Sequence, residues 1–303
     1  MEAPLAITRA DKNGRETQLH GTSMFPVGCY YDDLEIAPTP WHWHDEFDAV
    51  TVVQGSAIVS VANISFRVNA GDGFFINAEQ LHKVDPAGNS GCILHSISFH
   101  PRLVGGSFES TYWAKVVKPL QDNRTLTGFH LKPSVAWQKE AIRMINAAFY
   151  AYVDEPPAFE IEIRYHLSKL LFLLSLNAAS TAGSFSEREL RDNERMKLMI
   201  QYIHAHLSEE LTVNEIASSA LLSKSECLRC FKNTLHTTPM RYVKQHRIEI
   251  ASTMLLNTQQ KIADIGEACG FGDTSYFVQA FRDAKGVTPR VWRMEKSAKV
   301  TGR

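Results

Sequence analysis

Four polar side chains in the N-terminal half have types and spacings that suit binding of a solute or a metal ion. His42 and His44 are two residues apart, so on a β-strand both would point to one face. Asp48 has the same parity, and His82 is expected on a facing strand. Three or four nitrogen and oxygen ligands of this kind suit Fe, Mn or Zn. The same groups could instead hydrogen-bond a small solute in a metal-free pocket, or form only a rim.

A Cys-x-x-Cys pair, Cys227 and Cys230, is a second candidate for metal or redox chemistry. No second Cys pair or suitably spaced His accompanies it, and both residues are expected on the inward face of a helix. We therefore interpret them as small core residues. The chain has five cysteines, an odd number at scattered positions, which suggests reduced thiols and a cytoplasmic protein.

The C-terminal third carries mostly polar and cationic side chains on the outer faces of two expected helices. Side chains of these types contact bases and phosphates of DNA. The first set is Lys224, Ser225, Leu228, Arg229 and Lys232, and the second is Thr274, Ser275, Val278, Gln279 and Arg282.

Both sets belong to a unit that occurs twice. Phe231 and Phe281 are 50 residues apart, and so are Pro239 and Pro289. A repeat at fixed spacing indicates one supersecondary unit used twice. The unit has a helix, a tight turn and a second helix, the proportions of a helix-turn-helix whose second helix enters the DNA major groove. A plain helical bundle with a duplicated hairpin is the alternative.

Each unit has its own signals for where helices begin and end. Thr212 and Ser223 are each followed three residues later by Glu, which predicts two capping boxes. In the second unit Gly270 and Gly272 mark the turn, and Asp273 is expected to cap the second helix. The side chains expected in the core are Cys227, Cys230 and Phe231 in the first unit and Tyr276, Phe277, Ala280 and Phe281 in the second.

The region from about Glu194 to Glu295 resembles the double helix-turn-helix domain of the AraC/XylS family of bacterial transcription regulators. The resemblance is carried by Gly270-Phe271, Ser275-x-Phe277, Phe281, Gly286-x-Thr288-Pro289 and Arg293. It implies that two recognition helices enter successive major-groove segments on one face of DNA. The positions that match the base-contacting ones of the family are Ser225, Leu228, Arg229, Thr274, Ser275, Val278 and Gln279.

Two residues depart from the family pattern. His236 replaces the usual Gly after the first recognition helix, where a left-handed conformation is expected. Gln279 stands where a basic residue is common, which points to adenine or phosphate contact rather than guanine readout.

The N-terminal half contains several short strand patterns, which suggest a sandwich or barrel. The expected strands are Val50–Val53, Ala57–Val61, Ile64–Val68, Phe74–Ile76 and Ile93–Phe99, with turns at Gly55, Asn63 and Ala70–Gly73. The segment also resembles a cupin. His42-x-His44, Asp48 and Gly55 match the first cupin motif, with Asp in the usual Glu position, and Gly71-Asp72-Gly73 through His82 resembles the second. The resemblance implies a small jelly roll with a ligand in its interior, and it favours a metal-free pocket without a cofactor.

Two amphipathic helices are expected between these regions, at Trp137–Tyr152 and Phe159–Leu176. The apolar face of the second helix is wider than one antiparallel neighbour would cover and is a candidate dimer surface. Its residues are Leu167, Leu170, Leu171 and Leu174. The Ala-, Ser- and Gly-rich stretch 177–186 is typical of a linker.

The predicted fold is α+β and multidomain, with an N-terminal cupin β-barrel (jelly roll), a helical connector and a C-terminal all-α double helix-turn-helix. The expected bounds are 1–130 for the cupin-like sensor, 131–180 for the connector and dimerisation region, 181–192 for the linker and 193–303 for the DNA-binding domain. The two helix-turn-helix units are expected at about 212–235 and 262–285.

The charge distribution agrees with this division. The 303-residue chain has a net charge of −1. Residues 189–303 hold 17 Lys and Arg against 13 Asp and Glu, a balance of +4, whereas the remainder holds 15 against 20, a balance of −5. A basic DNA-binding module joined to an acidic module explains the asymmetry. No apolar run is long enough to span a membrane.

These observations predict a ligand-responsive regulator that binds duplex DNA as a homodimer, senses a small-molecule effector and, if an activator, contacts RNA polymerase. No catalytic residue is assigned. An alternative is a metal-dependent cupin dioxygenase or isomerase fused to a DNA-binding domain. A third possibility is a constitutive DNA-binding protein with a vestigial barrel.

Overall fold

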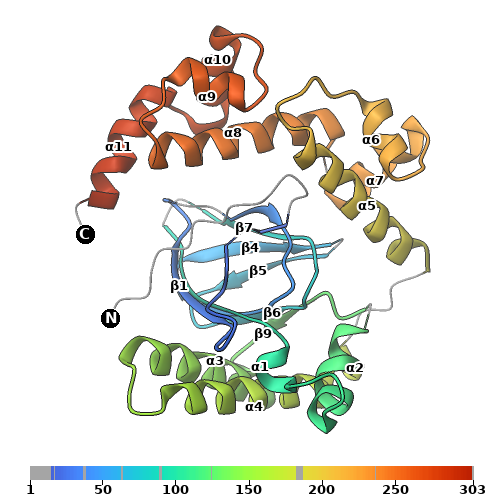
Figure 1. Ribbon diagram of the computed structural model, residues 1–303, viewed down its shortest axis with the longest axis vertical. Coiled ribbons are helices and arrows are strands. Elements are labelled where there is room, and N and C mark those ends of the chain that lie inside the picture. Colours follow the sequence, from blue (N-terminus) through green and yellow to red (C-terminus); the bar gives the residue numbers. More distant parts are fainter. Residues whose placement is uncertain are drawn as a thin grey trace. The chain divides into compact units, whose positions relative to one another are not determined.

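The computed structural model describes residues 15–16, 18–36, 39–62, 64–88, 91–123, 125–181, 187–235 and 237–301. Two compact units divide the chain, one mainly of residues 16–190 and the other mainly of residues 191–303. The strands and helices α1–α4 lie in the first unit and the helices after α5 in the second (Figure 1). No helix within these ranges combines the length and the apolar character needed to cross a membrane.

The first unit contains two antiparallel sheets, which confirms the predicted β-rich domain. One sheet has the strand order β1-β8-β3-β6-β9 and the other β2-β7-β4-β5. The strands are β1 (Val27–Asp33), β2 (Thr39–His42), β3 (Phe47–Gln54), β4 (Ser56–Val61), β5 (Ile64–Asn69), β6 (Gly73–Ile76), β7 (His82–Pro86), β8 (Ile93–Phe99) and β9 (Gly128–Leu131). The five expected strands correspond to β3, β4, β5, β6 and β8. The expected turn at Asn63 lies outside the described residues.

Alternation along β3 divides the interior of this unit into two cores. Phe47 and Ala49 belong to the cluster that packs against helices α3 and α4, whereas Val50 and Val52 belong to the cluster between the sheets. Asp48 has the parity of Val50, since side chains alternate between the faces of a strand. The sequence therefore places this carboxylate inside the barrel, where it lines a cavity.

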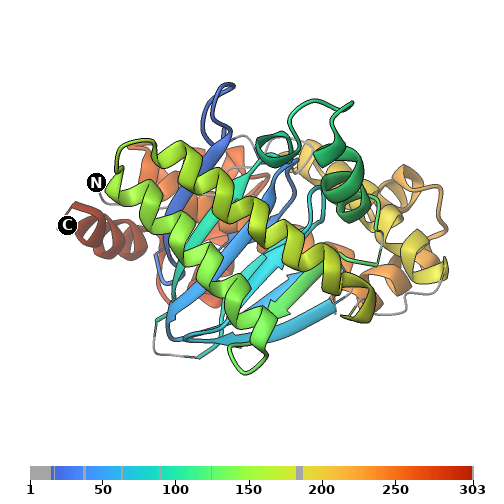
Figure 2. The same ribbon diagram turned by 90° about the horizontal axis from the view of Figure 1, so that it is seen from below.

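Two long helices, α3 (Ala136–Asp154) and α4 (Phe159–Thr181), pack against each other across the five-stranded sheet, as Figure 2 shows. Both match expected helices, and α4 is longer than predicted because it continues through part of the expected linker. Glu155 adopts a left-handed conformation at the end of α3. The short helices α1 (Arg102–Gly105), η1 (Trp113–Val117) and α2 (Lys118–Gln121) were not predicted.

The predicted dimer surface on α4 is wrong. Leu167, Leu170, Leu171 and Leu174 are fully buried in the cluster that α4 shares with α3 and the sheet. The helix packs against α1 and η1 as well as α3, so the broad Leu face is part of the core of this unit.

The second unit consists of helices. They are α5 (Glu187–Ala205), α6 (Val213–Ser219), α7 (Lys224–Thr234), α8 (Pro239–Asn257), α9 (Ile262–Ala268), α10 (Thr274–Lys285) and α11 (Pro289–Thr301). Residues 187–192 of the expected linker form the first turns of α5. Helix α8 connects the pair α6–α7 to the pair α9–α10 (Figure 1). His236 lies outside the described residues, so its expected left-handed conformation stays a prediction.

Candidate functional site

The first helix-turn-helix, α6 and α7, is held by the caps that the sequence predicts. The side chain of Thr212 accepts a hydrogen bond from the backbone N–H of Glu215, and the Glu215 carboxylate accepts one from the Thr212 N–H. Ser223 and Glu226 form the same reciprocal pair at the start of α7. Such boxes satisfy backbone donors that the first helical turn leaves unpaired. They fix where α7 begins and thus which of its residues face outward.

The second helix-turn-helix, α9 and α10, has a comparable framework. Asp273 accepts a hydrogen bond from the Tyr276 N–H at 2.7 Å, and Gly286 ends α10 in a left-handed conformation. Phe277, Ala280 and Phe281 are buried as expected. Tyr276 is not, because its side chain is 54% exposed at the margin of the apolar stripe.

The outer faces of α7 and α10 present the DNA-contacting candidates at matching positions. On α7, Leu228, Arg229 and Lys232 follow Ser225 by 3, 4 and 7 residues, so the four side chains share one stripe of the helix. Ser275, Val278, Gln279 and Arg282 repeat that spacing on α10. Lys224 and Thr274 begin the two helices. Of these ten side chains Val278 is half-buried and the others are exposed.

Two arginines outside the set of DNA-contact candidates hold the chain just before each helix-turn-helix unit begins. Arg247 of α8 donates to the carbonyl oxygens of Leu207 and Glu209, at 2.9 and 2.6 Å. Arg293 of α11 donates to the carbonyls of Leu255 and Gln260, at 3.2 and 2.8 Å. The two guanidinium groups thus satisfy backbone carbonyl oxygens that lie outside the hydrogen-bonding pattern of the helices. The signature position Arg293 has a structural role here.

The turns of the two helix-turn-helix units have different residues at one equivalent position. Gly270 has φ of +80°, and Leu221, 49 residues earlier, has φ of +55°. A Cβ on Gly270 would lie 2.4 Å from the Leu207 carbonyl oxygen and 2.8 Å from the Arg247 guanidinium carbon. The second turn therefore needs glycine both for its conformation and for close packing.

Gly270→Ala is expected to destabilise the second helix-turn-helix by about 1–3 kcal/mol, since it combines a strained φ with a steric clash. Urea denaturation of the full chain, followed by circular dichroism, measures the loss. Gly272→Ala is the matched control, because a Cβ there would meet open space and φ is not positive. Equal effects of the two substitutions would contradict this account of the turn.

In the N-terminal compact unit, mainly residues 16–190, the structure brings all four predicted ligand-binding side chains into one cavity. His42 on β2 pairs directly with His82 on the adjacent strand β7. His82 therefore comes from a neighbouring strand of the same sheet, and the expected facing strand was wrong. His44 follows β2, and Asp48 lies on β3 of the other sheet. The Asp48 Oδ2 atom is 3.2 Å from Nε2 of both His44 and His82.

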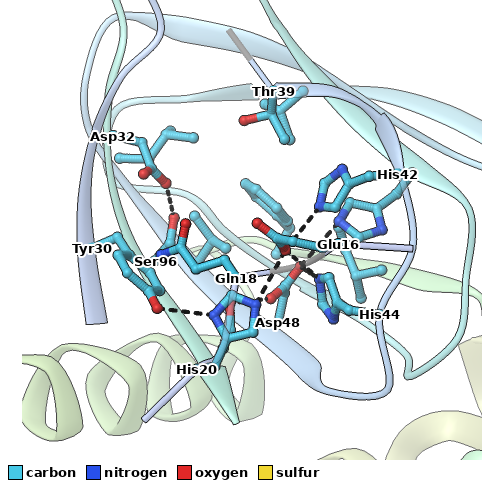
Figure 3. Close-up of a pocket in the computed structure, with 17 residues that line it drawn as sticks. Glu16, Gln18, His20, Tyr30, Asp32, Thr39, His42, His44, Asp48 and Ser96 are labelled. Atoms are coloured by element: carbon cyan, nitrogen blue, oxygen red, sulfur yellow. Dashed lines mark hydrogen bonds and ion pairs between the residues drawn. The ribbon is translucent and has the colours of Figure 1, made fainter. Parts of the chain in front are cut away.

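Eight further polar side chains line this cavity, and sequence reasoning missed them (Figure 3). They are Glu16, Gln18, His20, Tyr30, Asp32, Thr39, Ser96 and Ser98. Tyr30 and Asp32 alternate on β1, and Ser96 and Ser98 alternate on β8, so strand parity was the signal available for them. Glu16 and His20 precede β1, where no periodic pattern points to the interior.

Hydrogen bonds connect these groups into a network. The Glu16 carboxylate lies 3.1 Å from His20 Nε2, and His20 Nδ1 lies 3.0 Å from the Tyr30 hydroxyl. Ser98 donates to Asp48 at 2.7 Å, and Ser96 donates to Asp32. The polar groups are therefore held in place by the barrel before any ligand arrives.

Burial and neighbouring charges set opposite protonation preferences within the histidine cluster. Burial, with His82 nearby, lowers the pKa of His42 to about 3, so this ring is neutral at pH 7. Burial also acts to lower the pKa of His44, but the carboxylates of Asp48 and Glu16 outweigh it and raise that pKa to about 9. Burial acts against ionisation of Asp48, yet His44 and His82 hold its pKa well below the usual range.

The cavity is small and acidic. Its volume is about 50 Å³, below the roughly 300–1,000 Å³ of sites for drug-sized ligands. Among the described residues, its lining includes Glu16, Asp32 and Asp48 but no Lys or Arg. These properties suit a small polar or cationic ligand better than a large or anionic one.

Comparisons with known proteins agree with both halves of the geometry. A model described as an AraC-like ligand binding domain matches residues 29–131, and one described as a helix-turn-helix domain matches residues 216–295. The HTH-type transcriptional regulator YdeC of Bacillus subtilis is 29% identical over 95% of this chain and 98% of its own length. The HTH-type transcriptional activator RhaS of Klebsiella pneumoniae is 24% identical over 93% and 99%.

Among solved structures, ToxT from Vibrio cholerae is 12% identical and covers 88% of this chain and 97% of its own, with a TM-score of 0.48. The two domain matches lie on the barrel and on the repeated helical units described above. The chain is an AraC-family transcriptional regulator, with an AraC-like ligand-binding domain followed by a DNA-binding helix-turn-helix domain.

Proposed function

We propose that this regulator reads DNA with α7 and α10 and adjusts that binding according to what occupies the cavity lined by His42, His44, Asp48 and His82. The observation that carries the proposal is the presence, in one chain, of a preorganised polar cavity and two equivalent outward-facing helices. A ligand that binds one conformation of the first unit better than another shifts the population that is competent for DNA.

The DNA contacts that we propose divide into two kinds. Arg229 and Gln279 occupy equivalent positions and have the side chains that read guanine and adenine edges. Lys224, Lys232 and Arg282 carry charges that suit phosphates. The Gln279 amide donates to Asp283 at 2.7 Å, which orients the amide on the exposed face of α10.

Selection of genomic fragments by the purified full chain tests the DNA half of the proposal. We expect two conserved segments about one helical turn apart, because the two units sit on one DNA face in the family resemblance. Footprinting of the selected site should show protection in both segments. Enrichment of no fragment above random DNA would contradict the proposal, and the genes beside enriched sites would narrow the effector.

We further propose that the barrel has no catalytic role. The support is its similarity to regulators such as YdeC and RhaS. The enzyme alternative, a metal-dependent dioxygenase or isomerase, predicts turnover by the full chain with a ligand that binds its cavity. Recovery of such a ligand unchanged after prolonged incubation, at a constant effect on DNA binding, distinguishes a sensor from an enzyme.

We also propose a homodimer, through a surface of α4 other than the Leu face. Ile161, Tyr165, Phe172 and Leu176 have 42–71% exposed side chains. Their spacing of 4, 7 and 4 residues places them on one stripe. Two such stripes from two chains would cover each other, and a dimer would hold two DNA-binding domains at high effective concentration.

The double variant Ile161→Asp and Phe172→Asp is expected to convert a dimer to a monomer, since buried unpaired carboxylates oppose association. Light scattering of the full chain over micromolar concentrations measures this. Tyr150→Asp on α3, at a position that is 52% exposed, is the control and should leave the dimer intact. A wild-type chain that is monomeric throughout would overturn the proposed dimer.

Contact with RNA polymerase and a cytoplasmic location complete the proposal. RhaS is a transcriptional activator by name, and an activator bound beside a promoter acts on the polymerase. Chromosomal DNA as the partner, together with five buried unpaired cysteines, favours the reducing cytoplasm. Run-off transcription with purified polymerase on a selected site tests activation, and reduced output on adding the regulator would indicate repression.

A further inference from the structure

We propose that a groove between α8 and α10 holds the phosphate backbone of DNA, and that Arg241 and Lys244 bind it between the two segments that α7 and α10 read. This rests on the proposed reading of DNA by these two helices. It deepens that function by adding a contact from the helix that connects them.

The groove has one wall from each of two helices of the second unit. Its volume is about 580 Å³, within the roughly 300–1,000 Å³ of sites that admit drug-sized ligands. A stretch of sugar-phosphate backbone therefore fits between the walls. The walls include Arg241, Lys244 and Glu249 of α8 and Ala280 and Asp283 of α10.

The groove borders the outer stripe of α10. Ala280 follows the stripe residue Gln279 by one position, and Asp283 follows Arg282 in the same way. One position on a helix is a rotation of about 100°, so the stripe and the wall are adjacent strips of one helix. The Gln279 amide also donates to Asp283 at 2.7 Å, which joins the two strips. A duplex seated on the stripe thus brings its backbone to the edge of the groove.

Helix α8 is placed to contact the DNA between the two recognition helices, because it connects their two pairs. Successive major-groove segments lie about one helical turn apart, and a stretch of backbone lies between them. The Thr238 side chain caps α8 by accepting a hydrogen bond from the Arg241 N–H. The cap fixes where α8 begins and thus the direction of Arg241 and Lys244, which lie in its first turns.

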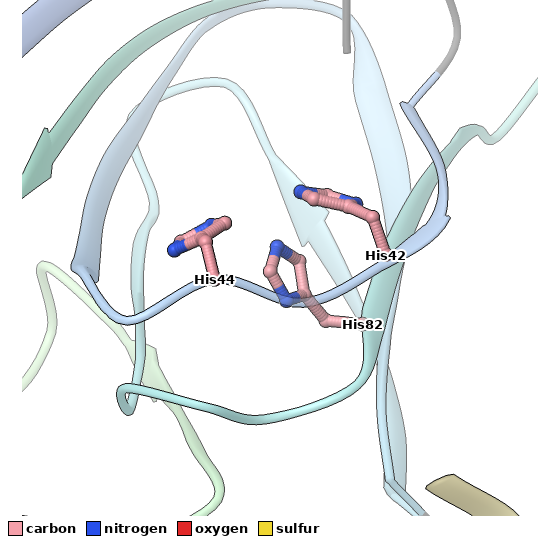
Figure 4. Close-up of side chains that lie close together, drawn as sticks. All are labelled: His42, His44 and His82. Carbon is pink, nitrogen blue, oxygen red and sulfur yellow. The ribbon is translucent and has the colours of Figure 1, made fainter. Parts of the chain in front are cut away.

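The two cations have no carboxylate partner within the described part of the chain, although two carboxylates line the same groove. The Glu249 carboxylate accepts a hydrogen bond from the Gln245 amide instead. Lys244 Nζ lies 5.4 Å from the centroid of the Tyr276 ring, which holds the ammonium beside α10. The histidines of the barrel differ, since they point toward one another (Figure 4) and two of them already contact Asp48.

The excess of positive charge favours an anion, and the position of the groove favours DNA. With Lys285, the described lining holds three cations against two carboxylates. A free phosphorylated metabolite would suit the same cations. DNA bound to the stripe of α10, however, presents its phosphates at high effective concentration one residue away. The groove then extends the DNA face onto α8.

Binding of the full chain to its selected duplex and to a random duplex tests the groove by fluorescence anisotropy. Arg241→Ala and Lys244→Ala should each weaken binding to both duplexes by about 10-fold at about 0.1 M salt, and each should reduce the magnitude of the salt slope by about 1. Arg191→Ala is the matched control, because this exposed cation of α5 does not line the groove, and it should change neither quantity.

Glu249→Gln gives a test that loss of folding cannot imitate. It removes a negative charge from the groove and should strengthen binding to both duplexes. Ethylation interference then locates the contact, because an ethyl group removes the charge of one phosphate. Ethylation between the two protected segments should block the wild type but not the Arg241→Ala, Lys244→Ala double variant.

Wild-type affinity and salt slope in that double variant, or the same interference pattern in both proteins, would overturn the inference. In that case loss of base preference in Arg229→Ala would still support reading of DNA by α7. Absence of binding by the wild type to any duplex would instead overturn the proposed function itself.

Discussion

Raising the salt concentration from 50 to 200 mM is expected to weaken binding of the full chain to its selected duplex by about 10³-fold or more. Exposed cations on α7 and α10, among them Lys224, Lys232 and Arg282, would displace counterions from phosphates. Roughly six phosphate contacts for two units would give a slope of log affinity against log salt of about −5. Fluorescence anisotropy with a labelled duplex measures that slope.

The local position of these charges is what matters, because the whole chain has a net charge of −1. Lys232→Ala and Arg282→Ala should each reduce the magnitude of the slope by about 1. Lys139→Ala, an exposed position on α3, should leave it unchanged. A slope near zero in the wild type, or an equal change in all three variants, would contradict the assigned DNA face.

The helical unit could be predicted from the sequence because its determinants are local. Thr212, Ser223 and Asp273 cap helices through hydrogen bonds to residues three positions away, and a window of a few residues contains both partners. The 50-residue repeat then aligned the two outer faces. Tyr276 was misplaced because it lies at the edge of the apolar stripe, where helical periodicity does not distinguish buried from exposed.

The cavity was predictable only in part. Parity along a strand placed His42, His44 and Asp48 correctly on one interior, but the pairing of His42 with His82 depends on which strands are neighbours. Glu16 and His20 reach the cavity from a segment with no strand pattern, so their position depends on tertiary contacts such as the bond from Glu16 to Trp43.

Helix α4 shows a further limit of pattern reading. Its apolar residues occur on more than one face, and the sequence does not tell which face meets α3 and the sheet. Leu167 and Leu171 lie in the core, whereas Ile161 and Tyr165 are exposed. Packing against elements distant in the sequence decides which face of α4 is buried. The dimer surface that we propose therefore lies on the opposite side of the helix from the Leu face.

Arg229→Ala is expected to weaken binding to the selected site by about 1–3 kcal/mol and to relax base preference at one position, as loss of a bidentate contact would. Arg229 is exposed on the outer stripe of α7, between Leu228 and the buried Cys230. The capping box at Ser223 fixes the start of the helix and hence the direction of this side chain.

Arg229→Gln makes a sharper test, because Gln279 occupies the equivalent position on α10. Arginine suits guanine and glutamine suits adenine, so the variant should shift the preferred base at one position of the site from guanine toward adenine. Lys232→Ala is the matched control: it should weaken cognate and random DNA alike, since a phosphate contact carries no base preference. The measurement is competition among duplexes that differ only at that base pair, at one salt concentration. If Arg229→Ala and Arg229→Gln lower the affinity for all four duplexes equally, Arg229 contacts phosphate, and base reading by α7 must come from Ser225 or Leu228.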